Sequence, residues 1–333
     1  MADFTTDTSR SDTSIKITKR TERSLYMFLI QNIINLIKSQ LVKKGEDFPP
    51  GSPQLDINKS AKKYCEVQER KVDDIYIYDL TAREPAPDHE SAETRQRKRI
   101  YYYAGGGWRA PCSSDHWSLC TELARRIPNA TVSIVSYPLA PKSPASKCFP
   151  QLMRLQHTLL EQAEQAKETF ILAGDSAGGN IILCLAIALL QENPDARCPA
   201  ALMAISPSTD LRRSNPDIKV VAKNDPILRV PFIEMSARDW RGDWPAEDPR
   251  VSPLFGDVSL LARRGVQVHG VVGGYDMLGP DAVLMREKCN EAGVVGEWLD
   301  WDKQMHCFPL MWSYKLPEGV AAKDWMVDVF SRC

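Results

Sequence analysis

The chain has almost no net charge, since 42 lysines and arginines stand against 43 aspartates and glutamates over 333 residues. Proteins that bind nucleic acid usually carry a clear excess of basic residues, so we expect no nucleic-acid partner. Long apolar runs are also scarce. Residues 1–19 are polar and lack the apolar stretch of a secretory signal, and no segment is typical of a membrane span. We therefore expect a cytoplasmic protein.

Cysteine spacing of the kind that indicates a metal site or a disulfide framework is missing. The nine cysteines are an odd number and form no C-x-x-C pair. Several lie in apolar helical contexts, as Cys184 does. This pattern is typical of reduced thiols in a reducing compartment, and we predict no metal site.

The composition that is present suits a globular protein, with 43% hydrophobic and 26% charged residues, enough to bury a sizeable core. The first apolar segment, residues 21–41, is interrupted by polar residues at helical spacing. We expect an amphipathic helix that packs on the protein body or on a substrate, with membrane-surface contact as the alternative. A linker rich in proline and glycine follows at 48–53.

From Val72 onward, short apolar strands alternate with helices. We predict strands at 75–78, 99–103, 132–135, 170–173, 201–205, 267–272 and 296–301. We predict helices at 117–127, 152–165, 180–190, 281–292 and 321–330. A polar loop occupies 81–97, and a long irregular stretch with several tryptophans and phenylalanines runs from 206 to 255. The alternation indicates a doubly wound, mostly parallel sheet.

The most informative local sequence is Gly174-Asp175-Ser176-Ala177-Gly178-Gly179, between an apolar strand and a long apolar helix. A G-x-S-x-G turn in that context is a nucleophile elbow, which holds one serine in a strained turn at a helix N-terminus. The alternative is an ordinary glycine-rich turn. The context favours the elbow, and we predict Ser176 as a nucleophile.

A serine nucleophile needs a base, and the base needs a carboxylate to orient it. Of the five histidines, His306 follows the last predicted strand, where ligands gather in such sheets, and we predict it as the base rather than a solvated loop residue. Asp276 follows strand 267–272 and lies between serine and histidine in the chain, as the order Ser…Asp…His requires. A helix cap is the alternative role for Asp276. Asp281 and Asp210 are weaker candidates for the acid.

Three consecutive glycines, 105–107, directly follow predicted strand 99–103. Their backbone N–H groups can approach a substrate oxygen without obstruction by side chains. We predict an oxyanion hole formed by the N–H groups of Gly105, Gly106 and Ala177. The alternative is a flexible glycine loop without a catalytic role.

Seven segments in collinear order resemble the hormone-sensitive-lipase-like branch of the α/β-hydrolase fold. Four resemble its HGGG loop, G-D-S-A-G-G elbow, D-x-L and H-x-F segments, and they lie at 104–107, 174–179, 276–278 and 306–308. Three more resemble its Y-x-L-A-P, S-P-x-x-D-L and D-P-x-x-S-P-L segments, at 137–141, 206–211 and 248–254. The resemblance runs from about residue 98 to the last residue.

This resemblance implies an α/β-hydrolase fold with a helical cap. We expect residues 1–70 to form an N-terminal cap segment and linker, residues 71–333 to form the hydrolase core, and residues 208–255 to contribute to the cap. Asp175 would belong to the elbow rather than act as the triad acid, and we expect Asp175 and Trp108 near the substrate pocket. Other aromatic residues that could line the pocket, or equally lie in the core, are Tyr26, Phe28, Trp240 and Trp244.

Two positions depart from the family pattern. Ala104 stands where the family has the histidine that opens HGGG, which removes a side chain that braces the loop but no N–H donor. Cys307 stands where a glycine usually follows the catalytic histidine, and its thiol would crowd the base. Neither change removes a triad member, but both depart from the pattern of broad esterases, and we therefore expect a specialised biosynthetic hydrolase rather than a digestive lipase.

The sequence thus predicts a serine hydrolase that cleaves a carboxylic ester, lactone or thioester of a small metabolite through an acyl-enzyme, without a metal or organic cofactor. One alternative is an acyltransferase, lyase or cyclase that uses the same triad. Another is a catalytically silent small-molecule-binding protein, against which the intact Ser176, Asp276 and His306 argue. The acyl group and the oligomeric state are left open.

Overall fold

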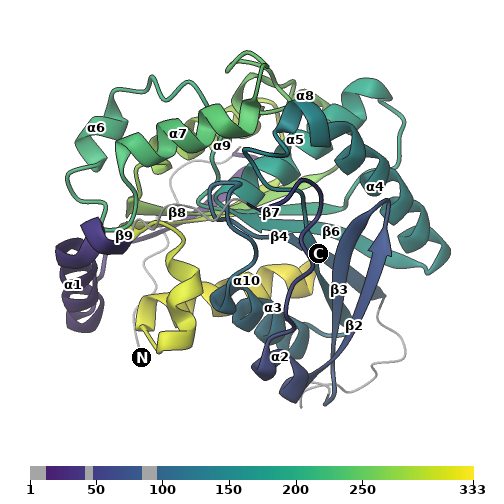
Figure 1. The fold of residues 1–333 in the computed structure, drawn as a ribbon, viewed down its shortest axis with the longest axis horizontal. Coiled ribbons are helices and arrows are strands. Elements are labelled where there is room, and N and C mark those ends of the chain that lie inside the picture. The colour runs from purple at the N-terminus through teal and green to yellow at the C-terminus, as the bar shows by residue number, and fades with distance from the viewer. Residues whose placement is uncertain (1–12, 42–47, 85–95) are drawn as a thin grey trace.

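The computed structural model describes residues 13–41, 48–84 and 96–333 (Figure 1). Within these residues, a nine-stranded sheet has the order β1-β9-β8-β7-β6-β4-β5-β3-β2. β3 runs antiparallel to β2 and β5, and the remaining neighbours pair in parallel, as predicted. The strands are β1 (Ile15–Arg20), β2 (Cys65–Val72), β3 (Ile75–Ala82), β4 (Arg97–Tyr103), β5 (Ala130–Ser136), β6 (Glu168–Asp175), β7 (Ala201–Ile205), β8 (Gln267–Tyr275) and β9 (Gly296–Met305).

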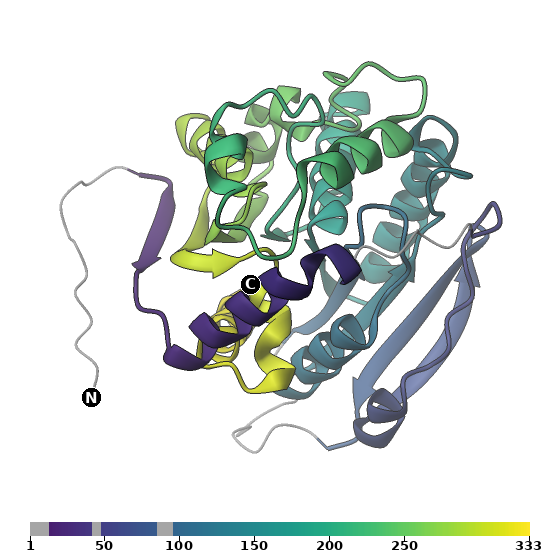
Figure 2. The ribbon, with the colours of Figure 1, turned by 60° about the vertical axis from the view of Figure 1, so that its left-hand side comes forward.

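Helices cover both faces of the sheet (Figures 1 and 2). One face carries α4 (Ala145–Gln165), α5 (Ala177–Glu192) and α9 (Gly279–Glu291), and the other carries α3 (Ser114–Arg126) and α10 (Pro317–Arg332). Successive side chains of a strand point to opposite faces. β4 accordingly places Tyr101 and Tyr103 in the same core as α5, and Ile100 and Tyr102 in the same core as α3. The doubly wound architecture is confirmed.

Two edge strands, β1 and β2, lie outside the strands predicted from the sequence. In β1, Ile15 is the buried position, and charged residues follow it. β2 is likewise rich in charged residues and pairs through one edge with β3. An edge strand is solvated along one side, so neither segment has the apolar pattern that predicts a strand. How residues 1–70 divide between cap and core remains a prediction.

The stretch 206–255, expected to be irregular, contains two α-helices and a short 3-10 helix. One face of the longer helix, α7, is buried through Ile233, Ala237 and Trp240, a spacing of four and three residues that suits a helix packed on a core. Prolines and charges around this face hide the periodicity in the sequence. These elements and the helix that follows are α6 (Asp217–Val221), α7 (Val230–Arg241), η2 (Pro253–Phe255) and α8 (Ser259–Arg263).

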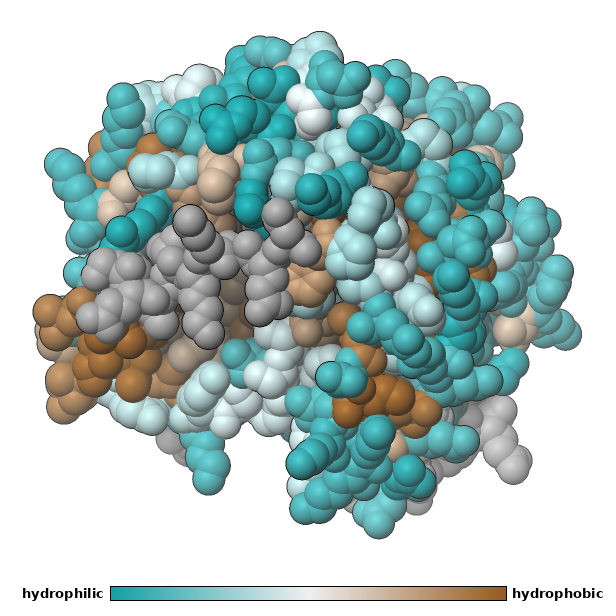
Figure 3. All heavy atoms as spheres, in the orientation of Figure 1, coloured by the Kyte–Doolittle hydropathy of each residue, from teal (hydrophilic) through white to brown (hydrophobic). Residues whose placement is uncertain are grey.

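The predicted N-terminal helix is α1 (Leu25–Leu41). It packs on the body through Met27, which is buried, and through Gln31, whose side chain donates to the Lys303 carbonyl at 2.8 Å. Several large apolar side chains on α1 are exposed and form the brown patch at the lower left of Figure 3. Among the described residues, we find no helix with the length and apolarity needed to cross a membrane. Two further short helices are α2 (Lys59–Tyr64) and η3 (Phe308–Tyr314).

Candidate active site

Ser176 lies in the sharp turn between β6 and α5. Its backbone has φ 52° and ψ −111°, a region that residues other than glycine rarely adopt. A Cβ on Gly178 would overlap the carbonyl oxygen of Tyr103 on the neighbouring strand, and a Cβ on Gly174 would press on Gly178. Both positions therefore require glycine, and the turn has the strained geometry of a nucleophile elbow.

His306 and Asp276 meet at the carboxyl ends of adjacent strands. Asp276 follows β8 and His306 follows β9, and Nδ1 of His306 lies 2.9 Å from Oδ1 of Asp276. Both residues are buried. Burial by itself would lower the pKa of His306, but the facing carboxylate of Asp276, together with Asp225 and Asp175, holds that pKa above its ordinary value. Because Nδ1 faces Asp276, Nε2 is the ring atom left to take up a proton.

Backbone and side-chain contacts tie the histidine loop to the nucleophile turn. The Ser176 N–H donates to the carbonyl of the last residue of β7 at 2.8 Å. The next residue, Ser206, accepts the N–H of Cys307 on its hydroxyl oxygen at 3.1 Å. The thiol of Cys307 also lies 3.6 Å from Oδ2 of Asp175. The residues that flank Ser176 and His306 are therefore in direct contact.

The glycine loop 105–107 follows β4 as predicted, but one of its expected donors is engaged inside the protein. The N–H of Gly105 donates to Oδ1 of Asp175 at 2.9 Å. An N–H that donates to a buried carboxylate is less available to a substrate oxygen, and the role of Gly105 in the oxyanion hole stays a prediction. The N–H groups of Gly106 and Ala177 also remain predicted donors.

The two residues expected near the substrate pocket, Asp175 and Trp108, are both buried. The Asp175 carboxylate accepts a hydrogen bond from the Tyr102 hydroxyl at 2.8 Å, beneath the elbow. Trp108 stacks on Trp240 of α7, with ring centroids 5.6 Å apart and planes 7° apart. Contact of either residue with a substrate stays a prediction. The other aromatic candidates divide between the α1 surface (Tyr26, Phe28), the core (Trp240) and a half-buried position (Trp244).

Among the histidines that the structure describes, only His306 contacts Asp276. His269 is buried in β8, where burial lowers its pKa to about 4. His157 is exposed on α4. His116, on α3, lies beside Asp175, and His89 lies outside the described residues. The competing acids are engaged with other groups: Asp210 pairs with the Arg212 side chain, and Asp281 accepts from the side chain of Asn215.

A second buried carboxylate, which the sequence analysis did not identify, lies beside the predicted triad acid. Oδ1 of Asp225 accepts the N–H groups of Ile227 and Leu228 at 2.8 and 2.9 Å, and Oδ2 accepts the N–H of Met277 at 3.0 Å. Burial, followed by the negative charge of Asp276, raises the pKa of Asp225. The Asp-Pro pair here is a turn signal, yet a turn signal does not indicate a distant partner.

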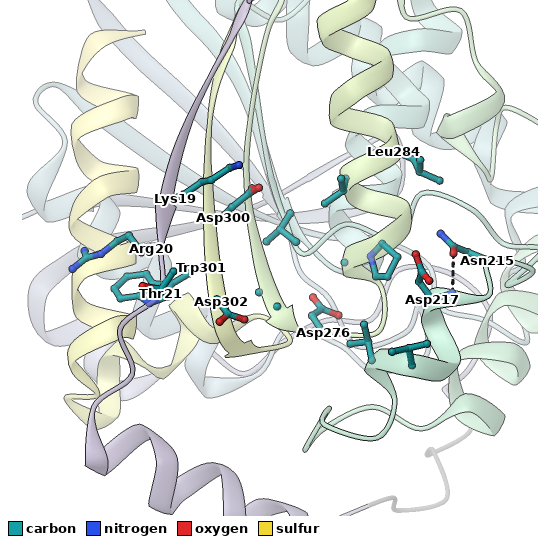
Figure 4. Close-up of a pocket in the computed structure, with 18 residues that line it drawn as sticks. Lys19, Arg20, Thr21, Asn215, Asp217, Asp276, Leu284, Asp300, Trp301 and Asp302 are labelled. Carbon is teal, nitrogen blue, oxygen red and sulfur yellow. Dashed lines mark hydrogen bonds between the residues drawn. The ribbon is translucent and has the colours of Figure 1, made fainter. Parts of the chain in front are cut away.

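A cavity of about 550 Å³ reaches Asp276 between the end of β1, α6 and α9 (Figure 4). Neither Ser176 nor His306 is among the described residues that line it. This cavity therefore does not contain the predicted nucleophile or base. Residues that line it include Lys19, Asp217, Leu284, Asp300 and Trp301.

Comparison with known proteins supports the fold. A family model described as alpha/beta hydrolase fold matches residues 100–310. An esterase of Acinetobacter venetianus is 31% identical over 204 residues, which cover 61% of this chain and 65% of the relative. Hormone-sensitive lipase of Ictidomys tridecemlineatus is 29% identical over 192 residues, which cover 54% of this chain and 24% of the relative.

Among solved structures, an esterase from the bacterial hormone-sensitive lipase family matches with a TM-score of 0.74 at 19% identity, over 93% of this chain and 99% of that chain. At this identity the likeness shows the fold alone. The chain spans 65% and 24% of the lengths of the two curated relatives. The family model covers most of the chain and includes the elbow, Asp276 and His306. Relatives named hormone-sensitive lipase agree with the resemblance predicted from the sequence, and the chain belongs to the alpha/beta hydrolase fold family.

Proposed function

We propose that this protein hydrolyses a carboxylic ester of a small metabolite through an acyl-enzyme, with Ser176 as nucleophile, His306 as base and Asp276 as the group that orients the base. The observation that carries the proposal is the buried 2.9 Å contact between His306 and Asp276, at the same sheet edge as the strained turn of Ser176. The esterase names of several relatives support the reaction class.

In the proposed reaction, Oγ of Ser176 attacks the acyl carbon while its proton passes to Nε2 of His306. The carbonyl electron pair moves onto oxygen, where the N–H groups of Gly106 and Ala177 stabilise the charge. His306 then gives its proton to the departing alkoxide. Water repeats the sequence on the acyl-enzyme, so that a carboxylic acid leaves and Ser176 regains its proton.

The packing of α7 supports a compact acyl group. Gly107 in the oxyanion loop faces the ring of Phe232, since a Cβ added to Gly107 would press on that ring. Trp240 of the same helix stacks on Trp108. Side chains therefore fill this side of the loop. Together with the departures at Ala104 and Cys307, this filled surface supports a specialised biosynthetic substrate rather than a long-chain fat.

The proposal is tested with p-nitrophenyl esters of graded chain length. We expect turnover of short esters by the wild type, and a loss of about 10⁵-fold or more in Ser176→Ala, since the nucleophile is removed. Ser214→Ala changes an exposed serine in the cap region and should match the wild type. Full turnover in purified Ser176→Ala would contradict the proposed mechanism.

Two further measurements separate the alternatives. In ¹⁸O-labelled water, a hydrolase places the label in the released acid, whereas an acyltransferase yields the ester of another acceptor. A fluorophosphonate probe should label Ser176 in the folded protein. A folded protein that is not labelled would favour the silent binding protein.

A further inference from the structure

The carboxylate of Asp175 is contacted by groups from four separate parts of the chain. It accepts hydrogen bonds from the Tyr102 hydroxyl at 2.8 Å and from the Gly105 N–H at 2.9 Å. Nε2 of His116 lies 3.1 Å from Oδ1, and the thiol of Cys307 lies 3.6 Å from Oδ2. Asp175 is 2% exposed. It therefore joins β4, the oxyanion loop, α3 and the histidine loop beneath the nucleophile.

His116 is the basic side chain that faces this carboxylate, and the start of α3 fixes its orientation. Its Nδ1 accepts the N–H of Ser113, the N-cap residue, at 3.0 Å and lies 2.7 Å from the Ser113 hydroxyl oxygen. A neutral imidazole that accepts at Nδ1 carries its proton on Nε2. Nε2 is the atom that faces Asp175, so the helix cap selects the tautomer that donates to the carboxylate.

We propose that His116 is a positioning residue for the oxyanion hole: it holds Asp175, Asp175 holds the Gly105 N–H, and the loop is thereby placed for the donor that follows. This inference rests on the proposed ester hydrolysis. It also accounts for Ala104, whose side chain cannot brace the loop. Here the bracing side chain comes from α3 instead of from the first residue of the loop.

The electrostatics explain why the loop would depend on His116. A buried carboxylate is costly unless hydrogen-bond donors compensate it. Burial would raise the pKa of Asp175, but His116, Tyr102 and the Gly105 N–H together hold it below its ordinary value. Without the imidazole, Asp175 loses the group that lowers its pKa most, and its protonated form is favoured. A protonated Asp175 becomes a donor, and the acceptor that holds Gly105 is weakened.

The test compares steady-state kinetics of variants at position 116 on an ester that the wild type hydrolyses. We expect His116→Leu to lower kcat about 10- to 100-fold with KM within about twofold, because oxyanion donors act mainly in the transition state. His116→Gln carries a neutral N–H₂ near the place of Nε2, and its kcat should be at least about tenfold higher than that of His116→Leu. His157→Leu, at an exposed position on α4, should leave both constants unchanged.

An unchanged kcat in a folded His116→Leu protein, or an equal loss in the Leu and Gln variants, would overturn the inference. If His116→Leu fails to fold, a double-mutant cycle of His116→Gln and Asp175→Asn replaces it. Residues that act through one contact should cost less together than the sum of their separate losses, and additive losses would again overturn the inference. If the wild type shows no ester turnover, or if its turnover does not depend on Ser176, the proposed function itself is contradicted.

Discussion

Nδ1 of His306 lies 2.9 Å from Oδ1 of Asp276, and the two residues are 6% and 0% exposed. Burial disfavours a charged imidazole, yet the carboxylate of Asp276, with those of Asp225 and Asp175, favours it, and the pKa of His306 is raised. In the proposed mechanism this pairing has a direct kinetic consequence, because a base has to lose its own proton before it can take one from Ser176.

We expect kcat/KM to rise with pH and to level off above an apparent pKa higher than about 6.5, the ordinary value for histidine. Neutral His306 is the active form, and Asp276 keeps the ring protonated up to a higher pH than usual. In Asp276→Asn the rise should move to lower pH, and kcat should fall by about 10⁴. pH–rate profiles of both proteins check this, and a rise that does not move contradicts the pairing.

Asp225 links the segment 206–255 to the loop of Asp276, the predicted triad acid, and its removal should destabilise the fold. Its carboxylate accepts three backbone N–H groups, one of them from Met277, the residue after Asp276. Asp225→Ala leaves these groups without their acceptor, so we expect the free energy of unfolding to fall by about 2–4 kcal/mol. Urea unfolding measures this change.

The control for Asp225 is Asp217→Ala, at an exposed position in the same region. It should change the free energy of unfolding by less than about 0.5 kcal/mol. We also expect Asp225→Ala to lower kcat, because the loop that carries Asp276 loses an anchor. A variant at position 225 with wild-type stability and kcat would show that the three bonds do not hold this loop.

The elements predicted from the sequence are those in which consecutive residues are apolar and buried. β7 was predicted at its observed bounds, because all of Ala201–Ile205 is buried and apolar. β1 and β2 were not predicted, because an edge strand needs few apolar side chains. α4 begins at Ala145, ahead of the predicted residue 152, and continues through Pro150. A proline near a helix start removes only one backbone hydrogen bond. The helix therefore continues through it, although a proline in a sequence usually marks a helix boundary.

For the same reason, some parts of the candidate site were predictable from the sequence and others were not. Ser176 was predictable because the glycines that allow its turn are adjacent in the chain. The contact of His116 with Asp175 spans 59 residues, and that of Asp225 with Met277 spans 52. Such pairings depend on the packing of α3 and of the cap region, which local spacing does not encode. The hydrogen bond from the Gly105 N–H to Asp175 was not predicted for the same reason, since its acceptor lies on another strand.

The stacked pair of Trp108 and Trp240 should be a main attachment of α7 to the oxyanion loop. Trp240 is 1% exposed, and truncation of a buried tryptophan to alanine costs about 3–5 kcal/mol. We expect that loss in Trp240→Ala, and a smaller loss in Trp240→Phe, which keeps an aromatic ring. Urea unfolding provides the test. Leu36→Ala, at a position 81% exposed, should differ from the wild type by less than about 0.5 kcal/mol. Wild-type stability of Trp240→Ala would contradict the attachment.

Cys307 occupies a backbone conformation that explains the glycine usual at this place in the family. Its φ of 53° and ψ of 33° are left-handed, which costs a residue with a Cβ about 1 kcal/mol. Cys307→Gly relieves this strain but gives up the thiol contact with Asp175. We therefore expect the free energy of unfolding to change by no more than about 1 kcal/mol, and the ester turnover to persist.

The thiol itself should be unreactive, because burial, with Asp175 and Asp276 nearby, raises the pKa of Cys307 well above its ordinary value. The thiolate is the form that alkylating reagents attack. With iodoacetamide at neutral pH, we expect Cys307 to be labelled more slowly than the half-buried Cys198, as followed by peptide mass spectrometry, with turnover retained meanwhile. Fast labelling of Cys307 with parallel loss of turnover would instead show that the histidine loop opens to solvent.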